Sequence, residues 1–325
     1  MNKIAVVTGC WGFIGNHLTK KLLQDDWFVY GIDKGSYVSN TDQLLYFSEN
    51  FPNKYKFVEE DITKLKRLPQ CDVVFNLAAE SHVENSFTNS NRFIKTNIDG
   101  VRNLLEIIDS TLSSYDKPLF FQISTDEVYG DIERESGYFN EDDHLNPSNP
   151  YAATKAAADL LIKSWARTHG LEYIIARPSN NYGIYQYHEK LIPLAVKRLQ
   201  ENKLIRLHNR GQPIRTWTHV DDTIDAILLL YEKADRNRIY NISSGFEQDN
   251  YTTVQKILNC YYMGRANIDI PDFMKYVDLK WERPGQDVRY AINCHHLIQY
   301  GWTPKKEFNN EIGYIVTYYK GKFTW

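Results

Sequence analysis

The chain has 325 residues, of which 42% are hydrophobic and 14% aromatic, and this content favours a large folded unit over a disordered chain. Its 38 Lys and Arg residues and 41 Asp and Glu residues leave a net charge of −3. This charge offers no field that would attract nucleic acid or an anionic membrane, so neither is expected as a partner.

The N-terminus carries only four apolar residues, at positions 4–7, before Thr8 and Gly9, and this run is too short for a secretory signal. No apolar run approaches the roughly 18 residues that a membrane-spanning helix needs. The four cysteines lie far apart without a CxxC pair, which argues against a zinc site and against a secreted disulfide framework. We therefore expect a cytoplasmic protein that binds no metal.

The N-terminal half alternates short apolar runs with longer amphipathic ones, the pattern of parallel strands joined by helical crossovers. It predicts an α/β fold with a doubly wound parallel sheet, a Rossmann domain over residues 1–178. After Pro178 this pattern breaks, and shorter elements rich in Arg, His and aromatic residues predict a smaller α/β substrate lobe over 179–325, part of which could return to the first sheet. The expected strands are 3–8, 28–33, 56–60, 72–77, 119–124 and 172–177, and the expected helices are 15–24, 91–111 and 151–169.

A glycine-rich turn over residues 8–15 follows the first expected strand and opens the first expected helix. Its glycines allow a tight turn, a close approach to a pyrophosphate and a helix N-terminus that faces this anion. Asp33 ends the second strand 18 residues after Gly15, where its carboxylate would bind a ribose diol and repel the extra phosphate of NADP. The turn predicts an NAD site, although Lys34 keeps NADP open, and a purely structural turn is the weaker alternative.

Polar residues close the fifth expected strand, in the order Ser124, Thr125, Asp126 and Glu127. They fall at the carboxyl edge, where doubly wound sheets bind ligands. Neighbouring residues on a continuing strand point to opposite faces, so both acids reach one substrate only if the strand ends at about Ser124. A solvated acidic turn is the alternative.

Tyr151 and Lys155 are four residues apart behind Pro150, so on a helix they share one face. A free phenol has a pKa of about 10, and lowering it to about 7 takes roughly 4 kcal/mol, which a nearby ammonium can supply. Such a pair is common on protein surfaces. Behind a dinucleotide turn, however, it predicts a catalytic tyrosine whose pKa the lysine lowers.

These motifs resemble those of the extended short-chain dehydrogenases/reductases and, within that superfamily, the nucleotide-sugar 4,6-dehydratases of the dTDP-glucose and UDP-glucose type. The resemblance covers nearly the whole chain. It rests on the glycine turn, residues 77–83, residues 124–131, Tyr151 with Lys155, residues 179–183, residues 189–193, Arg215, Asn250 and Arg283-Pro284-Gly285.

The resemblance implies an NAD-dependent lyase that forms a 4-keto-6-deoxy sugar nucleotide by internal hydride transfer. Tyr151, as phenolate, would take the O4 proton while C4 gives hydride to NAD, and Thr125 would bind O4. Glu127 would then remove the acidified C5 proton. Asp126, kept protonated, would protonate the departing C6 hydroxyl, which requires two adjacent carboxyls with separated pKa values. Whether the C5 proton returns to its original face stays open, and so does a 5-epimerase activity.

The resemblance also assigns binding residues and a homodimer that pairs the helices at 97–111 and 151–169. The residues implied for NAD are Gly9, Gly12, Phe13, Ile14, Gly15, Asp33, Asp61, Ile62, Leu77, Ala79, Tyr151 and Lys155. Those implied for the nucleotide-diphosphate hexose are Ser81, Asn180, Glu189, Lys190, Arg215, Asn250 and Arg289. Five of these, Asn180, Lys190, Arg215, Asn250 and Arg289, are assigned to the diphosphate, because two phosphates need fixed donors and compensating charge.

Some positions depart from the common pattern. Ile184, Tyr187 and His188 replace the prolines and the phenylalanine that are usual in a loop bordering the sugar, so a hexose altered at C2 stays open. Residues 39–40 and 85–87 look more like the eukaryotic UDP-glucose branch, which favours UDP-glucose or UDP-N-acetylglucosamine slightly over dTDP-glucose. A nucleotide-sugar 4-epimerase is the nearest alternative, and a non-catalytic NAD-binding regulator is the alternative of another class.

Overall fold

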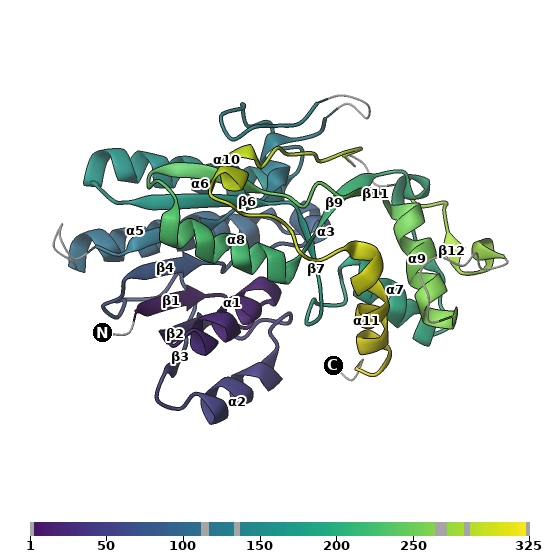
Figure 1. Ribbon diagram of the computed structural model, residues 1–325. Coiled ribbons are helices and arrows are strands. Elements are labelled where there is room, and N and C mark those ends of the chain that lie inside the picture. The colour runs from purple at the N-terminus through teal and green to yellow at the C-terminus, as the bar shows by residue number, and fades with distance from the viewer. Residues whose placement is uncertain (1–2, 112–116, 133–136, 264–271, 283–286, 323–325) are drawn as a thin grey trace.

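The structure is a computed structural model that describes residues 3–111, 117–132, 137–263, 272–282 and 287–322. Its main feature is a seven-stranded parallel sheet in the order β10-β6-β5-β4-β1-β2-β3 (Figure 1). The chain winds outward in both directions from β1 and β4, and sheets of this kind bind ligands at the carboxyl ends of the strands beside that reversal. The strands are β1 (Ile4–Thr8), β2 (Phe28–Asp33), β3 (Tyr55–Glu59), β4 (Val73–Asn76), β5 (Leu119–Ile123), β6 (Tyr173–Pro178) and β10 (Arg238–Ile242).

Helices cover both faces of this sheet, which confirms the predicted doubly wound α/β fold. Ala5 and Val7 of β1 pack in one apolar core with α1 and α8, whereas Val6 between them packs in another core with α5 and α6. Alternate residues of a strand point to opposite faces, so a strand buried on both sides is apolar throughout. The helices of this unit are α1 (Phe13–Gln24), α2 (Thr41–Asn50), α3 (Val83–Thr88), α4 (Ser90–Ile94), α5 (Gly100–Thr111), α6 (Pro150–His169), α8 (Val220–Lys233) and α10 (His295–Gln299).

The helix expected over 91–111 is interrupted by a π-helical turn, Lys95–Asp99, between α4 and α5. Asn97 in this turn donates to Thr154 of α6 at 2.9 Å and to the Glu80 carbonyl at 3.0 Å, and it accepts from the Glu80 amide at 2.9 Å. The wider turn therefore carries a buried amide that fastens the loop after β4 to the helix of Tyr151. A periodic apolar pattern carries no signal for such a turn.

The smaller lobe lies to the right in Figure 1 and has its own apolar core. A three-stranded sheet in the order β11-β9-β7 and a strand pair, β12-β8, pack with three helices. The elements are β7 (Asn180–Tyr182), β8 (Ile205–Arg206), β9 (Ile214–His219), β11 (Glu247–Asp249), β12 (Val277–Asp278), α7 (Leu191–Gln200), α9 (Asn250–Met263) and α11 (Phe308–Lys320). Because α8 and β10 belong to the first unit, the chain crosses between the units more than once, and the boundary after residue 178 stays a prediction.

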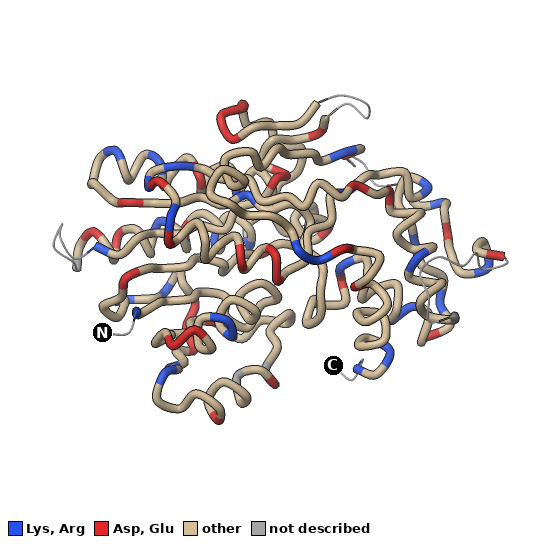
Figure 2. The backbone as a smooth tube through the Cα atoms, in the orientation of Figure 1, with Lys and Arg blue, Asp and Glu red and all other residues tan. Residues whose placement is uncertain are grey.

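Acidic and basic residues are interspersed along both units in Figure 2. This distribution fits the small net charge of −3. Among the described residues, no helix combines the length and the apolar content that crossing a bilayer would require.

Candidate active site

The glycine turn closes tightly between β1 and α1. Gly9 has a φ of +68°, and a Cβ atom on Gly15 would lie 2.1 Å from the Gly9 carbonyl oxygen, so this backbone contact excludes any side chain. No side chain caps the N-terminus of α1 at Gly12, which leaves the first helical N–H groups available to an anion. The turn therefore fits a dinucleotide pyrophosphate.

Gly15→Ala is expected to destabilise the protein by about 1–3 kcal/mol or more, because the added methyl group collides with backbone. Bound NAD should be lost as well, since the turn must open to relieve the contact. Thermal unfolding and the cofactor content after gel filtration measure the two effects. Gly313→Ala in α11 is the control, because the nearest atom to its added Cβ would be Cys260 Sγ at an ordinary contact distance of 3.9 Å. A Gly15→Ala protein with unchanged stability and cofactor content would contradict this assignment.

Asp33 organises the end of the cleft that would hold the adenosine. Its carboxylate accepts from the Trp11 amide at 3.1 Å, the Gly35 amide at 3.0 Å and the Ser39 hydroxyl at 3.2 Å. Burial raises the pKa of Asp33 against these hydrogen bonds. The side chain is thus held at the carboxyl end of β2, where a ribose diol can reach it.

Lys34 is engaged by neighbouring acids. Its ammonium lies 3.2 Å from Glu80 and 3.8 Å from Asp61. Asp61 itself accepts from the Thr63 amide at 2.9 Å, and the next residue, Ile62, lines the adenosine end of the cleft. These contacts leave Lys34 poorly placed to receive the extra phosphate of NADP.

One continuous cleft brings most of the predicted site residues together. Its two ends share seven lining residues, which are Gly9, Gly12, Val38, Leu77, Ala79, Ser81 and Glu189. The inner end is also lined by Phe13, Ile14, Gly15, Thr125, Asp126, Glu127, Tyr151, Lys155, Asn180 and Lys190. The glycine turn, the acids and the tyrosine therefore face a common space, as a hydride-transfer site requires.

The two acids follow β5 in a short 3-10 turn, Asp126–Tyr129, which Thr125 caps by accepting from the Glu127 amide at 3.3 Å. Asp126 is only 3% exposed, and its Oδ2 atom lacks a hydrogen-bond partner among the described residues. Burial, and then the charge of Glu127, raise the pKa of Asp126 to about 7. A carboxyl group with this pKa is often protonated near neutrality and can serve as an acid.

Glu127 is held from two sides. Its Oε2 atom accepts from the Asn149 amide at 3.1 Å and from the Tyr290 hydroxyl at 3.4 Å. The Tyr290 hydroxyl also donates to Asp287, and the Arg215 guanidinium lies over the Tyr290 ring at 4.5 Å. Residues far apart in the sequence thus fix one carboxylate at the cleft.

The Lys155 ammonium is engaged at the end of β5, and a lowering of the Tyr151 pKa by this lysine stays a prediction. The Lys155 ammonium donates to the Ile123 carbonyl at 2.6 Å, and burial lowers the pKa of Lys155 to about 8. Burial and then the charge of Glu127 raise the pKa of Tyr151, while a hydrogen bond with Thr125 opposes them. The contact with the Ile123 carbonyl therefore fixes where the Lys155 ammonium lies at the end of β5.

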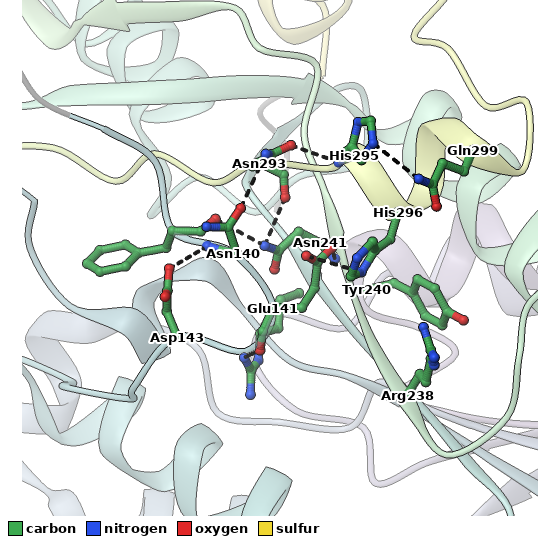
Figure 3. A network of polar contacts seen from close by, with 12 residues as sticks. Asn140, Glu141, Asp143, Arg238, Tyr240, Asn241, Asn293, His295, His296 and Gln299 are labelled. Atoms are coloured by element: carbon green, nitrogen blue, oxygen red, sulfur yellow. Dashed lines mark hydrogen bonds and ion pairs between the residues drawn. The ribbon is translucent and has the colours of Figure 1, made fainter.

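A buried polar network fixes the acid turn, Asp126–Tyr129, through its last residue. Tyr129, the last residue of that turn, accepts from Arg177 at 2.7 Å and donates to Asn241 at 2.9 Å. Arg177 in turn pairs with Asp159 of α6 at 3.0 Å. Figure 3 shows the outer part of the network, where Glu141 accepts from the Asn241 amide at 3.0 Å. The turn is thus tied to α6, β6 and β10 together.

Residues predicted to bind the hexose and diphosphate fall into two groups. In the cleft, Lys190 donates to the Ser81 carbonyl at 3.0 Å, Glu189 accepts from Tyr37 at 3.0 Å, and the buried Asn180 Oδ1 atom lacks a partner among the described residues. The second group comprises Arg215, Asn250 and Arg289.

In this second group, Arg215 of β9 lies over the Tyr290 ring, Arg289 precedes Tyr290 in the chain, and Asn250 lies in the smaller lobe. Arg215 donates to the Ile214 and Asp287 carbonyls at 2.7 and 3.3 Å. Arg289 pairs with Glu247 at 3.0 Å, so a carboxylate already balances its charge, and Asn250 begins α9. Arg283-Pro284-Gly285 lies outside the described residues.

The three positions that depart from the common pattern point in different directions. Tyr187 lines the cleft and meets Tyr37 edge-on, with ring centroids 5.4 Å apart. The Ile184 carbonyl instead contacts His17 at 3.1 Å, and His188 stacks on Tyr187 at 4.1 Å. Of the three, Tyr187 is therefore the side chain placed to touch a substrate.

Sequence reasoning missed Asn149, Tyr290 and Tyr37. Asn149 precedes Pro150, an N-cap pattern that signals a helix start but not a contact with Glu127. Tyr290 follows Arg289, which was assigned, and Tyr37 follows Asp33 by four residues. Their contacts cross between segments that sequence spacing does not relate.

Known proteins are similar to this chain in sequence and in fold. A model of the family described as GDP-mannose 4,6 dehydratase matches residues 6–313. The chain is 38% identical over 321 residues to the low-salt glycan biosynthesis protein Agl12 of Haloferax volcanii, covering 97% of this chain and 98% of that protein. It is 37% identical over 333 residues to the dTDP-glucose 4,6-dehydratase of Haemophilus influenzae, covering 97% of each.

Solved structures agree with these sequence matches. DesIV, a dTDP-glucose 4,6-dehydratase of Streptomyces venezuelae solved with NAD bound, has a TM-score of 0.88 and 32% identity, covering 98% of this chain and 97% of that one. The UDP-glucose 4-epimerase of Thermotoga maritima has a TM-score of 0.83 and 25% identity, covering 98% of this chain and 99% of that one. The fold is therefore shared by both reaction types, so the side chains at the site must distinguish them.

Proposed function

The chain belongs to the nucleotide-sugar 4,6-dehydratase family of the extended short-chain dehydrogenases/reductases and is an NAD-dependent hydro-lyase, and on this premise we propose that its substrate is dTDP-glucose. Several relatives at 30% identity or more, among them those of Haemophilus influenzae and Streptomyces venezuelae, are named dTDP-glucose 4,6-dehydratases, which supports this choice. The slight preference for UDP finds no such support. Ser39, on which it partly rested, contacts Asp33 at the cofactor end, and Phe87 is exposed to solvent.

The observation that carries dehydration is the pair of adjacent acids with different surroundings. Asp126 is buried with a pKa raised to about 7, while Glu127 accepts hydrogen bonds from Asn149 and Tyr290. Removing water across C5 and C6 requires one group that takes a proton and another that gives one. A 4-epimerase requires neither, so this pair favours a dehydratase over an epimerase.

Each side chain has one proton to hold or move. NAD, when bound, would accept a hydride from C4 and give it back to C6, and its positive ring would favour an ionised phenol nearby. Tyr151 takes the O4 proton, and a hydrogen bond with Thr125 keeps the Tyr151 hydroxyl in place. Glu127 takes the C5 proton, and Asp126 gives its proton to the C6 oxygen, which leaves as water. Return of hydride to C6 and of the proton to C5 completes the net loss of one water.

The diphosphate would lie between the units, with Lys190 and Asn180 on one side and Arg215 on the other. Lys190 would exchange the Ser81 carbonyl for a phosphate, a stronger charge-assisted bond. Arg289 would contribute less than expected, because Glu247 already pairs with it.

Return of the C5 proton by the same Glu127 would preserve the configuration at C5, which NMR of the product tests. The expected cytoplasmic location stays a prediction.

Incubation of the purified protein with dTDP-glucose, UDP-glucose, UDP-N-acetylglucosamine and GDP-mannose, without added NAD, tests the proposal. Mass spectrometry should show that dTDP-glucose loses one water faster than the other three sugar nucleotides do. Isomerisation without loss of water would identify an epimerase instead. Binding of NAD with no change to any of the four sugars would favour a regulator.

We also propose that the protein is a homodimer that pairs the helices at 97–111 and 151–169, which include α5 and α6, with α3 and α4 packed beside α6. Phe87, Ile94 and Leu160 on these helices are 47%, 44% and 57% exposed, an apolar group that a second copy would cover. Leu160→Glu is expected to convert dimers to monomers, because it would bury charge in the contact. Light scattering after gel filtration measures the mass. Ile298→Glu, on α10 and 48% exposed, is the control, and dimers that persist in Leu160→Glu would refute this interface.

A further inference from the structure

One side chain connects the base at C5 to the helix that carries the tyrosine. Asn149 accepts from the Ala152 amide at 2.9 Å and so caps α6, and it donates to Glu127 Oε2 at 3.1 Å. We propose that Asn149 is a positioning residue for Glu127, which sets this carboxylate relative to Tyr151. The inference rests on the proposed function, in which Glu127 removes the C5 proton.

Both contacts use the two halves of a single amide. Because Oδ1 accepts from the helix, Nδ2 must be the atom that faces Glu127, and an amide supplies both an acceptor and a donor. Ser and Asp cap helices about as well as Asn. A serine is too short to keep both contacts, and an aspartate would place a second negative charge beside Glu127. The cap alone therefore does not require the asparagine.

The hydrogen bond from Asn149 to Glu127 is buried, and it orients the carboxylate that would take the C5 proton. Asn149 is 4% exposed, so water competes little for its amide hydrogens. Tyr290 also reaches Glu127 Oε2, at a longer 3.4 Å, but its single hydroxyl proton is shared with Asp287. Of the two side chains that contact Glu127 Oε2, Asn149 makes the shorter hydrogen bond, and it does not share the donated proton with another acceptor among the described residues. Both fall on Oε2, which leaves Oε1 for the proton of the substrate.

Asn149 also lies two residues before Tyr151 and six before Lys155. The helix start that it caps therefore holds the tyrosine as well, and Tyr151 must act on O4 while Glu127 acts on C5. O4 and C5 are two bonds apart, joined through C4, so small errors in the separation of the two side chains are costly. A misplacement of about 1 Å can lower a rate by roughly 100-fold.

The variants Asn149→Ser and Asn149→Asp separate positioning from capping. Asn149→Ser should keep the melting temperature and the bound NAD of the wild type, because it keeps the cap. Asn149→Asp keeps the cap too but should melt at a lower temperature, because its charge is buried beside Glu127. Turnover on the accepted sugar should fall about 10- to 100-fold in Asn149→Ser and further in Asn149→Asp. Reduced nicotinamide should accumulate after substrate is added, and substrate deuterated at C5 should show a larger isotope effect than with the wild type. Asn89→Ser is the control, since Asn89 caps α4 at an exposed position.

Wild-type turnover in Asn149→Ser would overturn the inference. So would a loss of turnover that comes with a lower melting temperature and with neither reduced cofactor nor a changed isotope effect, because that result describes a cap alone. A wild-type protein that dehydrates no sugar nucleotide would overturn the proposed function and this inference with it. A dehydrating wild type with an unaffected Asn149→Ser variant overturns the inference only.

Discussion

Glu127→Gln is expected to abolish turnover while sparing oxidation at C4, so that reduced nicotinamide accumulates on the protein after substrate is added. An amide cannot accept the C5 proton, whereas Tyr151 and Thr125 still serve O4. Loss of a general base lowers a rate by about 10² to 10⁴. The absorbance of the reduced cofactor and the mass of the product measure the two halves of the reaction separately.

The matched control for this change is Glu232→Gln. Glu232 lies on α8, is 54% exposed and pairs only loosely with Lys3 at 3.5 Å. Exposed pairs of this kind contribute little to stability, so this variant should turn over as the wild type does. Full turnover in Glu127→Gln would remove Glu127 from its assigned role. A variant that fails to oxidise C4 would instead place Glu127 at the first step.

Loss of water should weaken as the pH rises through about 7, because Asp126 must be protonated to act as the acid. Burial and the charge of Glu127 raise its pKa to about 7 from the ordinary value of 3.8. Below pH 7 most of the protein carries the proton, and above it the proton is lost. A pH profile of turnover with saturating substrate measures this fall in rate above about pH 7. A rate that stays level well above pH 8 would argue against Asp126 as the acid.

The same shift predicts that stability also falls as the pH rises, so that removing the Asp126 charge should lower turnover but raise stability. A raised folded pKa means that the folded state loses stability as the pH rises from the unfolded value to the folded one. Three pKa units correspond to on the order of 4 kcal/mol. Asp126→Asn should therefore lower turnover by about 10² to 10⁴ and yet melt at a higher temperature than the wild type at pH 8. The two melting temperatures should converge near pH 4, and equal values at pH 8 would show that Asp126 is not strained.

These expectations share a physical basis in the acid turn. Asp126 is buried beside a like charge, and the network of Tyr129, Arg177 and Asn241 keeps the turn from relaxing away. Such strain is typical of active sites, where stability is exchanged for reactivity. The polar network is therefore as much a part of the site as the residues that line the cleft.

Much of the fold was predictable because the sheet is buried on both faces. The strand predictions agree with the structure to within one residue at each end, since buried parallel strands are nearly continuous apolar runs bounded by turns. The π-helical turn at Lys95–Asp99 and the short strands of the smaller lobe were not predicted. Both depend on contacts with distant segments, and neither leaves a periodic signal.

The sequence by itself determined which chemical groups are present and at which strand ends they appear, because glycine spacing, helix spacing and strand alternation are local properties. Thr125, Asp126, Glu127 and Tyr151 were assigned to the cleft in this way, and the cleft holds them. Only the tertiary structure decided the environment of each group. It drew Lys155 to the Ile123 carbonyl and placed Asn149 and Tyr290 on Glu127. Burial and neighbouring charge set protonation, and these depend on segments that meet only when the chain has folded.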